Sequence, residues 1–333
     1  MRIAYFIHGR GRGHSSRALT LLPRLRAEGC ECMVYAGDTA YEVLKGFDSV
    51  KRIKSIVPGS SFFLFVYRIW QDYRVLKQQR PHLLISDGDA PCTYAAKFLG
   101  IKVLSIGHAL IFPYCENPIE LPKVGLRKEN FKVRVATLCS HYKVAVHFTN
   151  IQPKNENTFV VRPDIFFDST AISDQGYLLS YFRDGNGQEL IVELINRGLK
   201  IKNFGNPIDL HGVENFAPDN LAFRKCLMGA TGVVGSAGSN LIFESIAMNK
   251  PLLLQYREDD FEQAANVKYV EHEGLGLGLI SNRLSTDRVQ DYLLLLNKSK
   301  KSTNSLGVIP ALSDIVVRIL KEEFNSQGFE KMV

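Results

Sequence analysis

The 333 residues exceed the span of about 100 to 200 that one ordinary α/β domain occupies, so two domains are expected. Hydrophobic residues make up 45% of the chain and charged residues 23%, a balance that excludes a disordered or fibrous protein. The formal net charge of +7 is compatible with nucleic acid, an anionic membrane surface or an anionic substrate, and it does not choose among them.

Short apolar stretches alternate with amphipathic ones from the first residue onward, which is typical of β-α units and predicts parallel sheets. In the first half we expect strands at residues 2–8, 32–36, 83–86, 103–106 and 144–148, with helices that include 15–28 and 90–99. The expected fold class is therefore α/β with doubly wound sheets. No apolar run approaches the roughly 20 residues that cross a bilayer, so we expect a cytoplasmic location.

A glycine-rich turn follows the first expected strand and reads HGRGRGHSSR over residues 8–17. Glycines let the backbone approach a ligand, and the following helix offers free N–H groups, so the turn predicts an anion or polar-ligand site. Gly9, Gly11 and Asp38 fit a dinucleotide-binding fingerprint. His14 stands where that motif needs a third glycine, which argues against a nicotinamide-dependent enzyme.

His14 is itself a candidate base. A histidine at the start of a helix faces the positive end of the helix dipole, which disfavours the protonated ring. A neutral imidazole in a cleft can accept a proton. For a histidine taken alone, a capping or packing role is the alternative interpretation.

Residues 61–73 read SFFLFVYRIWQDY and would be aromatic on all sides of a helix. A helix packed within the core is the first interpretation of this segment. The alternative is an apolar wall for a substrate, or a contact with a membrane.

The regular alternation lapses between residues 149 and 170, where Pro, Asn and Asp interrupt the apolar pattern. We place the domain boundary there, with a first domain at 1–150, a linker at 151–172 and a second domain at 173–308. The remaining segment, 309–333, contains an amphipathic stretch and is expected to return to the first domain as a helix.

The second half repeats the alternation, with expected strands at 177–181, 232–235, 251–255 and 277–280 and helices at 239–248 and 261–273. A second turn of small residues, VGSAGSN at 234–240, opens the first of these helices, and its amides suit a diphosphate. Ser236 and Ser239 are expected to cap that helix. Glu244 is either a ribose ligand or an ordinary solvated glutamate. The polar loop REDDFEQAAN at 257–266 suits a sugar with many hydroxyl groups.

The two turns and the polar loop together resemble a GT-B glycosyltransferase. The likeness is to the branch that contains the UDP-glycosyltransferases and the peptidoglycan lipid-intermediate N-acetylglucosaminyltransferase. The segments that carry it are GRGRGHSSR at 9–17, LLISDGDAP at 83–91, and 235–270, which begins GSAGSNLIFES. These segments lie in both halves with the order and spacing of the family. The resemblance implies two Rossmann-like domains that face a cleft.

The resemblance also implies roles for individual residues. His14 is the expected base, and Asp87 is the carboxylate that would orient it. The acceptor side is expected to include Gly11, Gly13 and His108, although the loop at 107–110 departs from the usual family sequence. The donor is expected to contact Gly235, Ser236, Gly238, Ser239, Asn240, Glu244, Glu262, Gln263 and Asn266. Arg10 and Arg12 add charge that would suit an anionic acceptor.

The implied reaction is inverting transfer of a sugar from a nucleotide diphosphate, with UDP favoured by the family, to a hydroxyl acceptor without a metal or other cofactor. Asp87 and Asp89 form a D-x-D sequence, which binds a metal in a different glycosyltransferase fold. Because the phosphate site is expected in the other domain, we predict no metal here and expect Asp89 to cap the helix at 90–99.

The acceptor is expected to be lipid-linked or another apolar hydroxyl compound, and peripheral association with the inner face of the membrane is an option. Two alternatives stay open: a nucleotide-sugar 2-epimerase or hydrolase of the same architecture, and a non-catalytic subunit that binds a nucleotide sugar. No nucleic-acid-binding motif is recognised, so no nucleic-acid partner is expected. The oligomeric state is not predicted.

Overall fold

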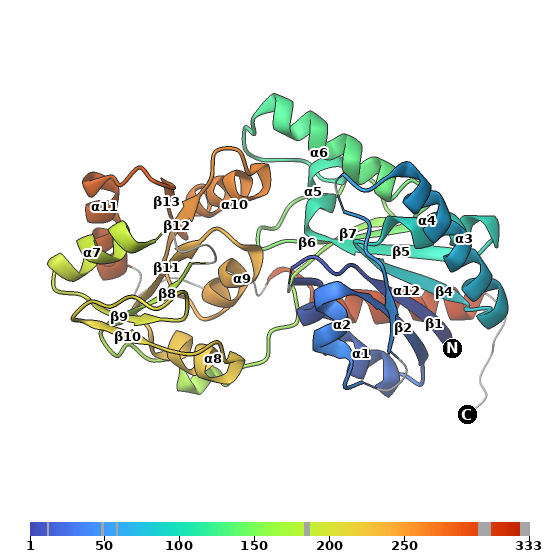
Figure 1. The fold of residues 1–333 in the computed structure, drawn as a ribbon, viewed down its shortest axis with the longest axis horizontal. Coiled ribbons are helices and arrows are strands. Elements are labelled where there is room, and N and C mark those ends of the chain that lie inside the picture. Colours follow the sequence, from blue (N-terminus) through green and yellow to red (C-terminus); the bar gives the residue numbers. More distant parts are fainter. Residues whose placement is uncertain (12, 48–49, 58, 183–186, 299–307, 327–333) are drawn as a thin grey trace. The chain divides into compact units, whose positions relative to one another are not determined.

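The computed structural model describes residues 1–326 apart from 12, 48–49, 58, 183–186 and 299–307 (Figure 1). Contacts divide the chain into two units, and each unit is built around a parallel sheet. Unit 1 comprises Met1–Pro118, Pro122–Asp164 and the C-terminal segment from Ile309. Unit 2 comprises Ile119–Leu121 and Ile165–Val308.

The described part of unit 1 contains a seven-stranded sheet in the order β3-β2-β1-β4-β5-β6-β7, with every neighbouring pair parallel. Its strands are β1 Arg2–Ile7, β2 Glu31–Gly37, β3 Val50–Ile53, β4 Leu83–Asp87, β5 Lys102–Gly107, β6 Tyr142–Val146 and β7 Thr158–Val161. The register aligns Ile7 with Asp87 and Asp87 with Ile106, so β1, β4 and β5 end at one edge. The chain order reverses between β1 and β4, and open α/β sheets bind ligands at such a switch point.

Helices cover both faces of this sheet (Figure 1). They are α1 Gly13–Ala27, α2 Asp38–Leu44, α3 Phe62–Gln79, α4 Ala90–Phe98, the 3₁₀ helix η1 His108–Leu110, α5 Ile111–Tyr114, α6 Lys123–Ala136 and α12 Leu312–Ser326. One face carries α1, α2 and α12, which contact one another through α1, and the other carries α3, α4 and α6. The C-terminal helix α12 is tied to the sheet because Glu323 accepts hydrogen bonds from Lys102 Nζ at 2.8 Å and from Tyr142.

The sequence did not reveal two strands of this sheet. Residues 158–161, which fall inside the segment expected to be a linker, form β7 and pair with β6. At the opposite edge, β3 has the sequence VKRI, and its two central residues are exposed. Short or charged edge strands carry little alternation of their own, because pairing with a neighbouring strand is what defines them.

Helix α3 corrects one expectation. Its inner face buries Arg68, Asp72 and Leu76, whereas Phe62 is 73% exposed and Phe63 is 84% exposed. The interpretation of this aromatic segment as a helix packed within the core is therefore wrong. Among the described residues, no helix is both long enough and apolar enough to span a membrane.

The described part of unit 2 contains a six-stranded parallel sheet in the order β10-β9-β8-β11-β12-β13. Its strands are β8 Tyr177–Tyr181, β9 Lys200–Asn203, β10 Val213–Asn215, β11 Gly232–Ser236, β12 Leu252–Tyr256 and β13 Gly276–Ile280. Its helices are the 3₁₀ helix η2 Ser169–Ala171, α7 Gln188–Asn196, α8 Asn220–Gly229, α9 Ser239–Ala247, α10 Phe261–His272 and α11 Thr286–Lys298. The order reverses between β8 and β11, where Tyr181 pairs with Gly235, so the second small-residue turn also opens at a switch point.

Candidate active site

His14 and Asp87 meet at the switch point of unit 1. His14 is the second residue of α1, and Asp87 is the last residue of β4. Nδ1 of His14 lies 2.6 Å from Oδ1 of Asp87. The two residues are 73 positions apart in the chain, and they meet because β1 and β4 are neighbours whose carboxyl ends share one edge.

Asp87 is fully buried, and three side chains direct donors at its carboxylate. Arg17 donates from Nη2 to Oδ1 at 2.6 Å and from Nε to Oδ2 at 3.1 Å. The hydroxyl of Tyr5 donates to Oδ2 at 3.3 Å. Burial alone would raise the pKa of Asp87, but the charges and hydrogen bonds of Arg17 and His14 outweigh burial and lower the pKa to about 2. The carboxylate is therefore ionised at any physiological pH.

Two contacts of Nδ1 bear on which nitrogen of His14 carries the proton. Nη2 of Arg17 lies 2.9 Å from Nδ1, and because a guanidinium can only donate, this contact is a hydrogen bond only when Nδ1 carries no proton. Nη2 already has an acceptor, since it donates to Oδ1 of Asp87 at 2.6 Å. A bare Nδ1 would face the carboxylate of Asp87 across 2.6 Å as one acceptor facing another. We infer that Nδ1–H donates to Asp87 and that the lone pair lies on Nε2, where a substrate proton could be accepted.

The absence of a side chain at Gly88 leaves room for the ring of His14. Gly88 has φ of +77°, and a Cβ at this position would lie 2.7 Å from Cε1 of His14. The ring of His8 also contacts His14 edge to face, with 5.7 Å between ring centroids. Burial and the neighbouring His14 lower the pKa of His8, so His8 favours the neutral form.

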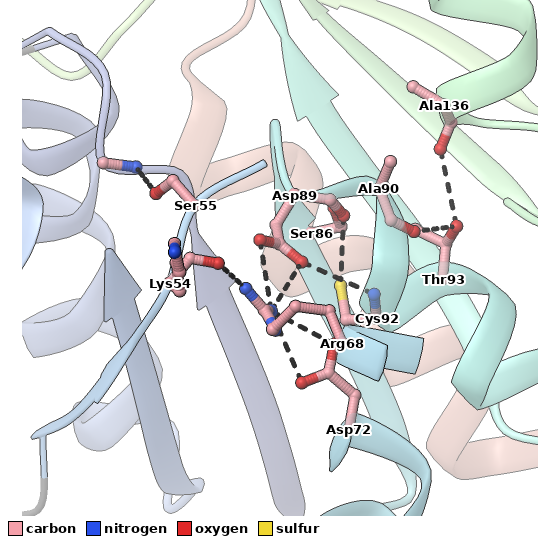
Figure 2. Close-up of polar contacts among 11 residues, drawn as sticks. Lys54, Ser55, Arg68, Asp72, Ser86, Asp89, Ala90, Cys92, Thr93 and Ala136 are labelled. Carbon is pink, nitrogen blue, oxygen red and sulfur yellow. Dashed lines mark hydrogen bonds and ion pairs between the residues drawn. The ribbon is translucent and has the colours of Figure 1, made fainter. Parts of the chain in front are cut away.

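The carboxylate of Asp89 points to Arg68 (Figure 2), whereas that of Asp87 contacts His14 and Arg17. As expected from the sequence, Asp89 caps α4 by accepting from the N–H of Cys92. Its carboxylate also lies 3.4 Å from Nη2 of Arg68, which is 3.1 Å from Asp72. Arg68 donates further to the carbonyl oxygen of Lys54. Asp87 and Asp89 therefore do not converge, and the described residues contain no group of three or more His, Cys, Asp and Glu that could hold a metal ion.

The expected acceptor-side residues lie along the same edge of the unit 1 sheet. Gly11 has φ of +78° in the turn before α1, and Gly13 is the first residue of that helix. His108 follows β5, and its Nδ1 lies 2.9 Å from the carbonyl oxygen of Val146. Arg10 is exposed beside them, while Arg12 lies outside the described residues.

In unit 2, the turn after β11 brings backbone amides to the sheet edge. Gly235 must be small, because a Cβ there would lie 2.4 Å from the carbonyl oxygen of Tyr181. The N-cap of α9 is Gly238, which makes no side-chain cap hydrogen bond. The prediction that Ser236 and Ser239 cap this helix is therefore wrong. Without a side-chain cap, the amides of the first turn, which include Ser239 and Asn240, are oriented to bind an anion.

The remaining predicted donor residues surround this turn within unit 2. Glu244 on α9 lies 3.3 Å from Nη2 of Arg224, and burial raises the pKa of Glu244. Glu262 accepts from the hydroxyl of Ser239 at 3.3 Å. Gln263 accepts at 3.3 Å from the backbone N–H of residue 257. Asn266 is buried and donates to the carbonyl oxygen of Ala237 at 3.1 Å, so it holds the turn in place.

A family model described as Glycosyl transferase family 1 matches residues 66–297, which is more than half of the chain. The chain belongs to glycosyl transferase family 1. It is therefore an enzyme that transfers sugars, and the match runs from α3 in unit 1 to α11 in unit 2.

Relatives and solved structures agree with this family 1 assignment. A UDP-N-acetylglucosamine--N-acetylmuramyl-(pentapeptide) pyrophosphoryl-undecaprenol N-acetylglucosamine transferase of Clostridium botulinum is 22% identical, over 93% of this chain and 96% of the relative. The structure of Acinetobacter baumannii MurG matches with a TM-score of 0.69 and 15% identity, over 96% of this chain and 99% of that one. CalG4, the calicheamicin glycosyltransferase, has a TM-score of 0.69 and 14% identity, over 98% of both chains. The fold is that of the GT-B glycosyltransferases.

Sequence reasoning missed the part that Arg17 plays in this family 1 enzyme. Arg17 ends the first glycine-rich segment, and the sequence alone gives it no role. Its distance of three residues from His14 on α1 was the available signal, because residues three apart share one face of a helix. Tyr5 was also missed, since a tyrosine inside a buried strand is ordinarily part of the core.

Proposed function

We propose that this glycosyltransferase moves a sugar from a UDP-sugar to a hydroxyl group of a lipid-linked acceptor, with inversion at the anomeric carbon. His14 would be the base and Asp87 the group that orients it. The observation that carries the proposal is the 2.6 Å contact between His14 and a buried, ionised Asp87. The name of the Clostridium botulinum relative supports the choice of donor and acceptor classes.

In the proposed step, Nε2 of His14 accepts the proton of the acceptor hydroxyl. The acceptor oxygen then forms a bond to the anomeric carbon as the bond between that carbon and the diphosphate oxygen breaks. The electron pair of the broken bond stays on the nucleotide diphosphate. Asp87 stabilises the imidazolium that results, and a single displacement of this kind inverts the anomeric configuration.

Unit 2 would hold the donor. The amides at the start of α9, next to Gly238, would bind the diphosphate and stabilise its growing negative charge. Glu244 would contact the ribose, while Glu262 and Gln263 would contact the sugar. Asn266 would act by fixing the turn.

We also propose that transfer needs no metal ion. Arg17 engages Asp87 and Arg68 engages Asp89, so neither carboxylate of the D-x-D sequence is available to a cation. The positive end of α9 would take the place of a metal at the leaving group. A cytoplasmic location, peripheral to the inner face of the membrane, fits a lipid-linked acceptor.

Replacement of the base is the decisive experiment. We expect His14→Ala to lower the transfer rate about a hundredfold to ten-thousandfold, while the exposed His211→Ala serves as a matched control with unchanged rate. The anomeric configuration of the product, read by NMR, tests inversion, and transfer in the presence of EDTA tests metal independence. Retained turnover in His14→Ala, retention of configuration, or loss of activity in chelator would each contradict part of the scheme.

Incubation of the donor without an acceptor separates the proposal from its enzymatic alternatives. A 2-epimerase or a hydrolase would convert the sugar nucleotide under these conditions, whereas the proposed transferase would leave most of it intact. A non-catalytic subunit would bind the donor and turn over nothing with any acceptor.

A further inference from the structure

Arg68 lies on the inner face of α3 and is among the largest fully buried side chains of the described structure, at 2% exposure (Figure 2). Its guanidinium meets two carboxylates, because Nη2 lies 3.1 Å from Oδ2 of Asp72 and 3.4 Å from Oδ1 of Asp89. Nη1 donates to the carbonyl oxygen of Lys54. One side chain therefore joins α3 to the segment that precedes this helix and to the loop that follows β4.

Stability alone is a poor reason to bury a guanidinium here. Asp72 and Asp89 are buried with it, at 4% and 1% exposure. Within the described part of the chain, Nε of Arg68 has no hydrogen-bond partner. Because desolvation offsets the attraction between buried charges, apolar side chains of similar volume often stabilise a fold equally well or better. The cluster is therefore best understood from the segments whose positions it fixes.

The first of these segments is the loop of Gly88 and Asp89, which joins β4 to α4. Gly88 has φ of +77° and packs against the ring of His14, since a Cβ there would lie 2.7 Å from Cε1. Glycine is the most permissive residue, so its own backbone does little to hold this position. Asp89 supplies the restraint, because its carboxylate accepts from Arg68 and its carbonyl oxygen accepts from the hydroxyl of Ser86 at 2.6 Å.

The second segment supports the glycine-rich turn before α1. Lys54, whose carbonyl oxygen accepts from Arg68, is followed by the buried Ser55. Oγ of Ser55 accepts the N–H of Gly9 at 2.9 Å. The turn runs directly into α1, whose second residue is His14. The two segments that flank His14 are therefore both held by one guanidinium.

We propose that Arg68 is a positioning residue for the pair of His14 and Asp87. It acts through Asp89 on the loop after β4 and through Ser55 on the glycine-rich turn. These restraints keep the two segments at the spacing that the 2.6 Å contact between His14 and Asp87 requires, because a reacting pair must be held to within about 0.5 Å. The inference rests on the proposed role of His14 as the base.

A variant without charges separates positioning from stability. Arg68→Met alone would leave Asp72 and Asp89 buried without a cation, so we expect it to unfold readily. The triple variant Arg68→Met/Asp72→Leu/Asp89→Asn removes every charge of the cluster, and asparagine at position 89 can still cap α4. We expect the triple variant to unfold at the urea concentration of the wild type or above it. Its kcat should fall about tenfold or more, while the KM for the sugar donor stays within about twofold, because unit 2 holds the donor.

NMR of the full chain labelled with ¹⁵N-histidine reads the position of the ring without any substrate. We expect the ring signals of His14, identified by their absence in His14→Ala, to shift in the triple variant. The matched control is a buried cation in unit 2. Lys250 is 6% exposed, and its Nζ donates to the carbonyl oxygens of Ser173 at 2.8 Å and Ala230 at 2.6 Å. Lys250→Met should lose stability but keep the wild-type kcat and the wild-type His14 signals.

Three results would overturn the proposal. The first is a folded triple variant with the wild-type kcat and unshifted His14 signals. The second is an equal fall of kcat in Lys250→Met, because loss of stability would then account for both variants. The third is a triple variant that does not fold, because the cluster would then be needed for the fold itself.

The NMR signals separate this proposal from the proposed function. If His14→Ala still transfers sugar while the triple variant shifts the His14 signals, the proposed base is wrong and the positioning role of Arg68 stands. If His14→Ala is inactive while the triple variant keeps the wild-type kcat and signals, the positioning role is wrong and the proposed function stands.

Discussion

Replacing Asp87 with Asn keeps the shape of the side chain but removes its charge, and it leaves the guanidinium of Arg17, 10% exposed, without its carboxylate. Removing one partner of a buried ion pair lowers the free energy of unfolding by about 3 to 5 kcal/mol, because the other charge stays buried without its partner. The lowered pKa of Asp87, about 2 against an ordinary 3.8, gives a smaller figure of about 2 kcal/mol, because burial offsets part of the gain. We expect a loss in the free energy of unfolding between these limits.

The variant Asp87→Asn should also lower transfer by about a hundredfold or more, because an amide can hold His14 in the wrong tautomer and cannot stabilise an imidazolium. Adding Arg17→Met removes both charges together. We expect the double variant to regain most of the lost stability while activity stays low. Urea unfolding at pH 7 and steady-state rates with a saturating donor measure the two effects separately.

Acid conditions give a second measurement of the same pair. Because the folded pKa of Asp87 lies below its unfolded value, its stabilisation is present above about pH 4 and is lost as the pH falls toward 2. The stability gap between the wild type and Asp87→Asn should therefore narrow in that window. A double variant no more stable than Asp87→Asn, or Asp87→Asn with the wild-type transfer rate, would refute the reasoning.

Three further predictions concern other parts of the two units. Gly88→Ala should lower kcat at least tenfold, because the added Cβ would press on His14. Gly100 is the matched control, because it also has a positive φ but a Cβ there would meet no atom within 4 Å. Gly100→Ala should lower the free energy of unfolding by only about 1 kcal/mol and keep the wild-type rate. Asn266→Ala removes the hydrogen bond to the carbonyl oxygen of Ala237 in the turn of unit 2, so we expect the free energy of unfolding to fall by about 1 to 3 kcal/mol and the KM for the sugar donor to rise. An unchanged KM would show that the turn does not depend on this amide. Burial and the neighbouring Asp89 raise the pKa of Asp72 to about 7, so the wild type should lose stability as the pH rises from about 4 to 7. Thermal unfolding should show a smaller loss of stability over that pH range in Asp72→Asn than in the wild type.

Much of the fold could be predicted because local pattern determines it. The strand, turn and helix at the start of each unit follow from apolar runs and small residues, and Asp89 caps α4 as its place before Ala90-Pro91 indicated. The edge strands β3 and β7 could not be found in this way, because pairing rather than alternation defines them.

The sequence by itself determined two α/β halves, the glycine turns and the helix on which His14 stands. Only the tertiary structure decided that Arg17 joins His14 at Asp87 and that the phenylalanines of α3 face outward. The physical reason is that hydrogen bonds and burial depend on which strands and helices become neighbours. Residues 73 positions apart meet through the register of a sheet, and no local pattern records that register.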